Sequence, residues 1–403
     1  MAALPYWRRA AKVIYWVFKH TWHTTISVLT LLAAILLPVS AYSDMISPTV
    51  WIVAPFLGLA FGVILVLSLL WLAFLILTRH WGLTLLVVAV LLMCGGRIWR
   101  YCPIHLSDQP AIANEVEQNG EVGTSRVDTI RVLTFNTCSL GRAKVNRMDA
   151  PIPVIDMVNE SGADIVCLQE YNFSLSKKGQ SEEMIRDKLR KNYPYYHLLL
   201  NSGSKNTGIA LYSKWPILYT EKIDKKEKKY CWAFYCELKI HGRKVGLVNC
   251  HLRNNSISKS NRKLFHDQVE HFDADSLRRM EEGFRQLGPS FRERTEQVAL
   301  INRFLRGRAE KRKVEIPMLI CGDMNDTPAS FAYRVMRGDL DDAWEDAGCG
   351  LGISFRDMPF WFRIDHIFHS KHFRTLRAER LDYMKESDHF PVMATFQFLN
   401  EEE

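Results

Sequence analysis

The residues best suited to chemistry follow a short apolar run toward the C-terminal end of the chain. Residues 318–321 (Met-Leu-Ile-Cys) are typical of a strand buried on both faces, and Gly322 breaks the run just before Asp323, Asn325 and Asp326. A carboxylate and a carboxamide two positions apart on an extended segment point the same way. Such oxygen donors suit a site that holds a hard cation and a phosphate group. Because turns after strands are also rich in Gly, Asp and Asn, this segment alone leaves an ordinary turn as the alternative.

Acidic, amide and imidazole side chains recur at the ends of several other predicted strands. Each one taken singly is ordinary turn chemistry, but a set of this kind at corresponding places is hard to attribute to turns. The pattern therefore indicates one shared site. Its residues are Asn136, Glu170, His251, Asp323, Asn325, Asp365, Asp388 and His389.

The elements that must position these residues alternate between strand and helix patterns. Strands are predicted at residues 129–135, 164–168, 208–212, 231–239, 244–249, 317–321, 363–369, 374–383 and 391–398. Helices are predicted at residues 151–161, 181–192 and 330–336, and within the charged stretch 257–307, of which 256–289 reads as an insertion. Interleaved strands and helices, with several adjacent strands in the middle, predict a mixed α/β sandwich.

The first hundred residues are very apolar and have a different organisation. A membrane-spanning helix needs roughly 20 apolar residues. Three transmembrane helices are therefore predicted at about residues 24–42, 50–77 and 81–101, and a buried helical core is the less favoured alternative. Residues 107–126 are polar, acidic and poor in large apolar side chains, which is typical of a linker. The predicted organisation is an anchor at 1–106, a linker at 107–126 and a folded domain at 127–399.

The distribution of basic residues predicts the orientation of this anchor. Five basic residues lie on the side of the N-terminus and two on the other side, and the more basic side faces the cytoplasm. Three crossings then place the folded domain outside the cytoplasm, in the periplasm or the extracellular space if the source is bacterial. The two groups are Arg8, Arg9, Lys12, Lys19 and Arg79, against Arg97 and Arg100.

Charge and cysteine content narrow the classes of function. The net charge of +8 at pH 7 is compatible with a phosphate-bearing substrate or an anionic surface but is too weak to indicate nucleic acid. None of the 9 cysteines has zinc-type spacing, and no disulfide framework is indicated. The absence of such a framework fits awkwardly with an exported domain.

Seven segments of the folded domain together resemble the endonuclease/exonuclease/phosphatase superfamily, which has the DNase I-like fold. They span residues 127–399 in the family's order, whereas the apolar anchor lies outside the resemblance. The segments are LTFN at 133–136, DIVCLQE at 164–170, GIALYSKWPI at 208–217, VNCHL at 248–252, GDMNDTP at 322–328, RIDHIF at 363–368 and SDHFPV at 387–392. The resemblance implies an α/β (α+β) four-layer sandwich of two packed mixed β-sheets flanked by helices, here preceded by an all-α transmembrane segment.

The resemblance also implies a role for each site residue. Glu170 would be the principal ligand of Mg²⁺ or Mn²⁺, with Asn136 and Asp388 nearby, since such ions prefer hard oxygen donors. Asp323 would align or deprotonate the attacking water, and Asn325 would hold the phosphate. His389, oriented by Asp365, would complete the acid/base apparatus. His251 would donate a hydrogen bond to a non-bridging oxygen of the phosphate.

The family acts on lipids, inositol phosphates, nucleic acids and other phosphate esters, so fold and site do not choose the substrate. Attachment to a lipid bilayer outside the cytoplasm favours a lipid headgroup or another extracytoplasmic phosphate ester. A nuclease acting on extracytoplasmic DNA or RNA and a catalytically silent binding module of the same fold are the alternatives. The sequence identifies no protein partner.

Other polar residues are interpreted more simply. Arg292 and Arg294 could reach a phosphate from a helix, but a solvated helix face is the favoured interpretation. The remaining histidines of the folded domain have contexts typical of surface or sheet-face residues; those considered are His266, His271, His366, His369 and His372.

Overall fold

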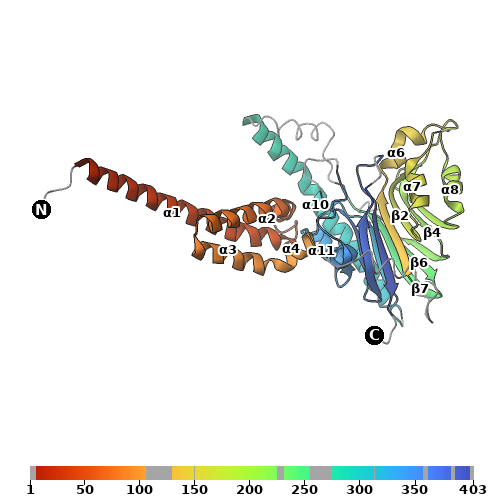
Figure 1. Cartoon of the computed structure of the whole chain (residues 1–403). Helices are drawn as coiled ribbons and strands as arrows, with labels where there is room; N and C mark the ends of the chain where they lie inside the picture. The colour runs from red at the N-terminus through yellow and green to blue at the C-terminus, as the bar shows by residue number, and fades with distance from the viewer. Residues whose placement is uncertain are drawn as a thin grey trace.

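The folded domain is built on two mixed six-stranded sheets that pack face to face, with helices on both outer faces (Figure 1). A computed structural model describes residues 6–105, 129–148, 150–224, 231–254, 274–312, 314–356, 362–382 and 386–399. The predicted linker at 107–126 and residues 256–273 of the predicted insertion lie outside the described residues. The predicted architecture of two packed sheets flanked by helices and preceded by a helical segment is confirmed.

The first sheet has the strand order β11-β12-β1-β2-β4-β3. Its strands β1 and β2 run parallel, and the other neighbours are antiparallel. Parallel pairing brings the carboxyl ends of β1 and β2 to one edge of the sheet. The bounds are β1 Thr129–Asn136, β2 Ile165–Asn172, β3 Tyr195–Leu200, β4 Thr207–Ser213, β11 Phe373–Arg380 and β12 Val392–Phe398.

The second sheet has the strand order β5-β6-β7-β8-β10-β9. Here β7 and β8 are the parallel pair, so their carboxyl ends also share an edge. Strands β3 and β5 are absent from the sequence-based prediction because neither combines clear alternation with flanking turn signals. The bounds are β5 Ile217–Lys222, β6 Trp232–Ile240, β7 Arg243–His251, β8 Met318–Asp323, β9 Asp341–Asp342 and β10 Asp365–His369.

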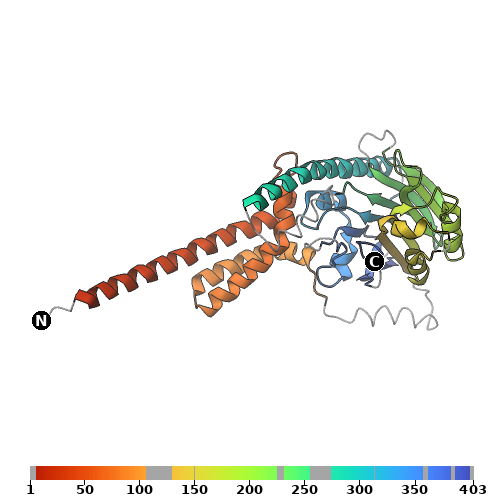
Figure 2. The same ribbon diagram turned by 90° about the horizontal axis from the view of Figure 1, so that it is seen from above.

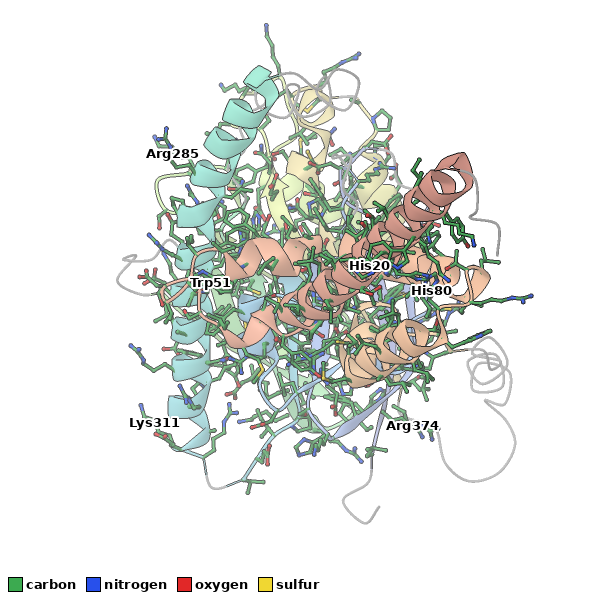
Figure 3. The ribbon with its side chains drawn as sticks, turned by 90° about the vertical axis from the view of Figure 1, so that its left-hand side faces the viewer. His20, Trp51, His80, Arg285, Lys311 and Arg374 are labelled. Carbon is green, nitrogen blue, oxygen red and sulfur yellow. The ribbon has the colours of Figure 1, made fainter. Side chains whose placement is uncertain are left out.

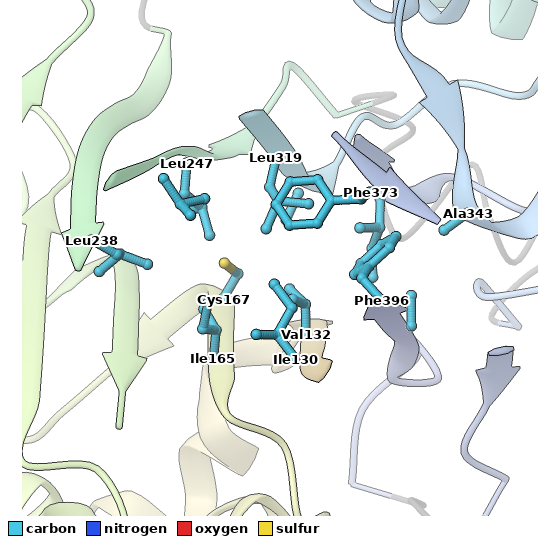
Figure 4. Packing of buried hydrophobic residues seen from close by; sticks show 14 of the residues in the cluster. Ile130, Val132, Ile165, Cys167, Leu238, Leu247, Leu319, Ala343, Phe373 and Phe396 are labelled. Atoms are coloured by element: carbon cyan, nitrogen blue, oxygen red, sulfur yellow. The ribbon is translucent and has the colours of Figure 1, made fainter. Parts of the chain in front are cut away.

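The main core lies between the two sheets (Figure 4). Ile130, Val132 and Cys167 of the first sheet meet Leu247 and Leu319 of the second, and all five side chains are fully buried. Burying side chains of this size stabilises the fold by about 1.5–3 kcal/mol each relative to exposure. The sandwich is therefore held by apolar contact between sheets, which leaves the sheet edges available for polar groups.

Helices close the two outer faces of the sandwich. On the first sheet, α8 begins after Ser181, whose hydroxyl accepts a hydrogen bond from the Met184 backbone N–H as an N-terminal cap. On the second sheet, the long helix α10 and the short helix α11 cover the outer face (Figure 2). The bounds are α6 Cys138–Val145, α7 Pro153–Glu160, α8 Glu182–Arg190, α10 Ala274–Ala309, α11 Phe331–Arg337 and α12 Ala343–Ala347.

The N-terminal helices form a bundle that projects from one side of the sandwich (Figure 2). Seen from its free end, the bundle has α10 beside it (Figure 3). Its elements are α1 Tyr6–Ala41, the short helix η1 Ser43–Met45, α2 Ala54–Leu77, α3 Trp81–Met93 and α4 Gly95–Tyr101. In the described part of the chain, Ile14–Ala41 and Ala54–Leu77 are long and apolar enough to cross a membrane. Helices α3 and α4 would make a third span only if the pair, bent by 61°, counts as one.

Two details of the bundle differ from expectation. Helix α1 begins at Tyr6 rather than near residue 24, so the predicted flanking basic residues lie on the helix itself. The predicted third helix is broken at Cys94. After the break, Arg97 and Arg100 of α4 lie against the carboxylate of Asp44. The prediction of three crossings therefore stays a prediction, whereas two apolar helices of spanning length are present.

Candidate active site

The predicted strand ends converge at the edge of the sandwich where the carboxyl ends of β1, β2, β7 and β8 lie. The Asn136 amide at the end of β1 donates a hydrogen bond to Asp323 Oδ2 at the end of β8, 2.9 Å away. Its second contact is Glu170 Oε1, at 3.4 Å. One layer deeper, Gln169 Nε2 donates to Asn249 Oδ1 over 2.8 Å, which ties β2 to β7. Polar groups from four strands thus join the two sheets at this edge.

Glu170 reaches the site because β2 is irregular at that position. The pairing of β2 with β4 shifts register between Leu168 and Tyr171, and Glu170 has a φ of 48°. A positive φ is uncommon for a residue with a side chain and is typical of functional sites. The predicted strand at 164–168 ends before this bulge, whereas the observed strand continues through it. The bulge turns the carboxylate toward the site and leaves it one-third exposed.

Gly322 allows β8 to approach β7 closely just before the site. Its φ is +152°, and a Cβ at this position would lie 1.9 Å from the carbonyl oxygen of Cys250. The next residue, Asp323, is fully buried, and its Oδ1 accepts a hydrogen bond from the Asn325 backbone N–H over 2.9 Å. Asn325 has a φ of 52°, and its amide donates to the Leu252 carbonyl. This turn holds the Asp323 carboxylate in one orientation.

His389 and Asp365 form a buried pair beside Asp323. His389 Nδ1 lies 2.8 Å from Asp365 Oδ2, and its Nε2 lies 3.7 Å from Asp323 Oδ2. Burial by itself would lower the pKa of His389, but the charges of Asp365 and Asp323 outweigh burial and raise that pKa to about 10. The imidazole is therefore cationic at neutral pH, with one N–H directed to Asp365 and the other beside Asp323.

His251 is buried between the carboxylates of both sheets. Its Nε2 lies 3.5 Å from Asp323 Oδ2 and 4.0 Å from Glu170 Oε1, and the Trp232 ring packs against it. Within the described residues neither ring nitrogen has a hydrogen-bond partner. Since buried polar atoms are normally paired, these nitrogens leave hydrogen-bonding capacity for a bound phosphate oxygen.

Asp388 completes the set from the segment before β12. The neighbouring Ser387 hydroxyl donates to the Asn136 carbonyl over 2.7 Å and accepts from the His389 backbone N–H. Asp388 is partly exposed, as Glu170 is. Burial is the main cause that raises the pKa of the Cys138 thiol to about 11, and the nearby charges of Asp388 and Glu170 raise it further. All eight predicted residues are therefore brought into one region.

The donor set at the accessible side of this region fits a hard divalent cation. Glu170 and Asp388 are the two partly exposed carboxylates, and Asn136 adds an amide oxygen, although that oxygen also accepts from the Cys138 backbone N–H. A second group, Asp323, Asp365 and His389, has potential ligand atoms within 4.8 Å of one another. Asp365 and His389 of this second group already bond to each other, which leaves fewer of its ligand atoms open to a cation.

A layer of buried polar residues behind the site is absent from the sequence-based prediction. Arg294 of α10 is completely buried, with its Nε 3.1 Å from Asp326 Oδ2 and its Nη1 2.9 Å from the Arg253 carbonyl oxygen. The expectation of a solvated helix face is therefore wrong for Arg294, whereas Arg292 is exposed. Arg292 and Arg294 are only two positions apart in a charged helix, so the sequence pattern does not indicate which of them is buried. Burial of Asp326 on the facing loop is the physical reason for the difference.

His366 belongs to the same layer. It is almost completely buried in β10, its Nε2 lies 3.1 Å from the Asp326 carbonyl oxygen, and its ring packs on Tyr333. Burial is the main cause that lowers the pKa of His366 to about 4. The sheet-face interpretation is correct for this residue, and its contact with Asp326 makes it a support for the turn that carries Asn325.

Comparison with known proteins adds two family matches. The model of the endonuclease/exonuclease/phosphatase family matches residues 133–389. A model described as a domain of unknown function matches residues 23–101, which contain most of the helical bundle. A search among curated proteins finds no match.

Three solved structures are similar to the chain. The catalytic domain of human Nocturnin with a bound sulfate anion is 18% identical, with 68% of this chain and 94% of that chain covered and a TM-score of 0.47. Truncated Caenorhabditis elegans TDP2 is 19% identical, with 67% and 97% covered and a TM-score of 0.46. An endonuclease/exonuclease/phosphatase from Beutenbergia cavernae is 16% identical, with 67% and 72% covered and a TM-score of 0.45.

Arg294 and Arg292 make a matched pair for testing the buried layer. Arg294→Met leaves the Asp326 carboxylate buried without its cation, and such losses cost about 3–5 kcal/mol. Arg292→Met removes an exposed charge and is expected to change stability by less than about 0.5 kcal/mol. Thermal unfolding of the full chain in detergent measures both. Equal melting temperatures for the two variants would contradict the assignment of Arg294 to the core.

His366 predicts a pH dependence of stability. The unfolded chain protonates this residue near pH 6.5, but the folded chain does so only near pH 4, so its contribution is present above pH 6.5 and is lost as pH falls toward 4. Between pH 7 and pH 5 the loss amounts to about 2 kcal/mol. His366→Gln removes this titration, so its unfolding free energy should fall less over the same interval. Parallel pH profiles for the variant and the wild type would refute the prediction.

Proposed function

Because this chain belongs to the endonuclease/exonuclease/phosphatase family, whose members hydrolyse phosphoric ester bonds, we propose that it is a membrane-anchored, divalent-metal-dependent phosphoesterase. It would hydrolyse a phosphodiester or phosphomonoester by in-line attack of an activated water. The observation that carries the proposal is the convergence of Asn136, Glu170 and Asp323, from three strands of two sheets, within hydrogen-bond distance.

Asp323 is the group proposed to handle the attacking water. Its Oδ1 accepts the Asn325 backbone N–H and its Oδ2 accepts the Asn136 amide, so the carboxylate cannot rotate away. A fixed carboxylate orients the water and accepts its proton as the oxygen bonds to phosphorus. The bond from phosphorus to the departing alkoxide breaks on the opposite side, and the alkoxide takes a proton from solvent. The products are a phosphate ester, or phosphate, and an alcohol.

Cationic and neutral donors are proposed to hold the phosphate. The imidazolium of His389, kept charged by Asp365, faces the space beside Asp323 and can donate to a phosphate oxygen. The His251 ring nitrogens have no hydrogen-bond partner within the described residues, so the ring would donate its N–H to a non-bridging oxygen, and Asn325 would contact the phosphate from the turn. These donors are positioned before the substrate arrives, so little reorganisation is needed as negative charge builds in the transition state.

Glu170, Asn136 and Asp388 are the proposed ligands of Mg²⁺ or Mn²⁺. Two of the three are partly exposed carboxylates. This suits an ion that keeps some of its water ligands and that a substrate reaches from solvent. When bound, such an ion would neutralise charge on the phosphate and on the leaving oxygen.

A lipid headgroup or another extracytoplasmic phosphate ester is the favoured substrate class. Two helices of spanning length support attachment to a bilayer, and the loop that carries Asn325 continues directly to Ala329, which packs into the core of the helical bundle. The site therefore lies next to the anchor rather than at the end of a long tether. Nucleic acid is the alternative that the substrate panel below tests.

Orientation in the membrane is predicted from the basic residues at the N-terminal side. A reporter fused after Glu403 is expected to be active only outside the cytoplasm, because positively charged flanks stay in the cytoplasm. The same reporter fused after Arg79 should give the opposite result. Activity of the Glu403 fusion in the cytoplasm would overturn the predicted location of the catalytic domain.

Glu170 provides the test of the reaction. Glu170→Gln keeps the size of the side chain but removes a charged ligand, so kcat on bis-p-nitrophenyl phosphate with Mg²⁺ should fall by about a hundredfold or more. Removing divalent ions with a chelator should abolish the wild-type reaction, and Mg²⁺ or Mn²⁺ should restore it.

Glu183, an exposed residue of α8 on the outer face of the first sheet, supplies the matched control. Glu183→Gln should retain wild-type kcat. Equal activity of the Glu170 variant and wild type would sink the mechanism, and no activity of wild type on any ester would favour a binding module. A panel of phospholipids and supercoiled plasmid, assayed with the same variants, separates a lipid substrate from nucleic acid.

A further inference from the structure

The helical bundle contacts the folded domain at the loop that carries the proposed phosphate-binding residue. This loop, residues 324–330, connects the end of β8 to α11. Figure 1 shows α11 beside the end of the bundle at α4. Its Ala329 is part of the buried cluster formed by Leu37, Ala41, Phe61 and Leu65 of the bundle. Ala329 follows Asn325 by four residues, so the chain passes directly from the site into the bundle core.

Gly58 of α2 makes the closest approach at this interface. A Cβ at Gly58 would lie 2.5 Å from the Ala329 carbonyl oxygen and 2.8 Å from Ser43 Oγ. The Ser43 hydroxyl itself lies 3.5 Å from the same carbonyl oxygen. A side chain at position 58 would therefore have to displace the backbone of the 324–330 loop, since a backbone carbonyl cannot rotate aside as a flexible side chain can.

Asp44 stands at the centre of the polar part of the interface. Its carboxylate is fully buried, with Arg97 Nη1 at 2.6 Å and Arg100 Nη1 at 3.6 Å. Its backbone carbonyl accepts a hydrogen bond from Arg334 Nε of α11 over 2.9 Å. A buried carboxylate is costly unless it is paired, so these ion pairs hold η1 against α4 within the bundle. The hydrogen bond from Arg334 to the Asp44 backbone carbonyl then joins η1, held in this way, to α11.

The same cluster reaches the strand that carries the partner of His389. Arg363 donates to the Arg100 carbonyl, and Arg363 precedes Asp365 by two residues. The intervening Ile364 accepts a hydrogen bond from the Met324 backbone N–H over 2.9 Å. The loop after β8 and the start of β10 are therefore bonded to each other, and both rest on the bundle.

We propose that the helical bundle maintains the geometry of the active site. Asp44 and Gly58 are positioning residues that hold the 324–330 loop and the start of β10 in place. Neither residue touches the substrate; each acts through the backbone that carries Asn325 or Asp365. This inference rests on the proposed hydrolytic function, but the geometry it concerns can be measured without activity.

Four single variants of the full chain in detergent micelles test the proposal. Gly58→Ala and Asp44→Asn perturb the two contacts. Gly82→Ala is the matched control for the first, because Gly82 lies in α3 with nothing within 4 Å of an added Cβ. Asp164→Asn is the control for the second, because Asp164 pairs with Lys214 at 2.8 Å at the start of β2, away from the bundle.

The readout is hydrolysis of bis-p-nitrophenyl phosphate, a soluble ester that needs no membrane surface. Gly58→Ala and Asp44→Asn should lower kcat about tenfold or more, because small misplacements of catalytic groups have large effects, with a much smaller change in KM. The two controls should keep wild-type kcat. If the bundle only tethers the domain to a membrane, all four variants keep wild-type kcat on this soluble ester, and the proposal is overturned.

Hydrogen exchange gives an independent result. Amides of residues 324–330 should exchange faster in Gly58→Ala and Asp44→Asn than in the controls, while amides of β3 and β4 stay unchanged in all four. Exchange in 324–330 identical to wild type refutes the proposal even when activity is lost. Inactive wild-type protein with the predicted exchange pattern would count against the proposed hydrolysis alone. If Asp44→Asn fails to fold, Gly58→Ala against Gly82→Ala decides the question.

Discussion

The structure depends on the burial of two carboxylates, Asp323 and Asp365, at the edge where the sheets meet. Each would be too costly to bury alone, and the imidazolium of His389 between them compensates for both. The compensation works only if the polar atoms of the three side chains stay within 4.8 Å of one another. This requires the antiparallel pairing of β8 with β10, which sets Asp323 directly opposite Asp365. The fold at this edge is therefore stable only when these three side chains have the geometry seen in the site.

Buried carboxylates paired with a cationic side chain also occur farther from the site. Asp326 is paired with Arg294 behind the turn, and Asp44 is paired with Arg97 at the bundle. Buried ion pairs contribute little net stability compared with apolar packing, but each one penalises any alternative arrangement that would separate its partners. One such pair lies behind the turn that carries Asn325 and the other lies in the helical bundle, so both restrict the arrangements open to the 324–330 loop. They also make the helical bundle part of the same structural unit as the site.

Much of the fold and of the candidate site could be predicted from local pattern. Short apolar runs ending in Asn136, Glu170, His251 and Asp323 indicated strands with polar ends, and these do meet at one edge. Residues whose position depends on a distant partner were not predictable. Arg294 and Arg292 look alike in the sequence, and only the loop that packs on α10 distinguishes the buried one from the exposed one. Glu170 required a bulge, which has no local signal in an otherwise regular apolar strand.

The sequence by itself determined which residues could do chemistry, the mixed sandwich, and the presence of apolar helices long enough to cross a membrane, because these follow from residue type and periodicity along a few neighbouring positions. The tertiary structure alone decided that the helical bundle rests on the loop after β8. Contacts such as Asp44 with Arg334, or Gly58 with Ala329, join residues more than 250 positions apart. Their partners are selected by packing and by the need to compensate buried charge, and neither leaves a pattern in the surrounding sequence.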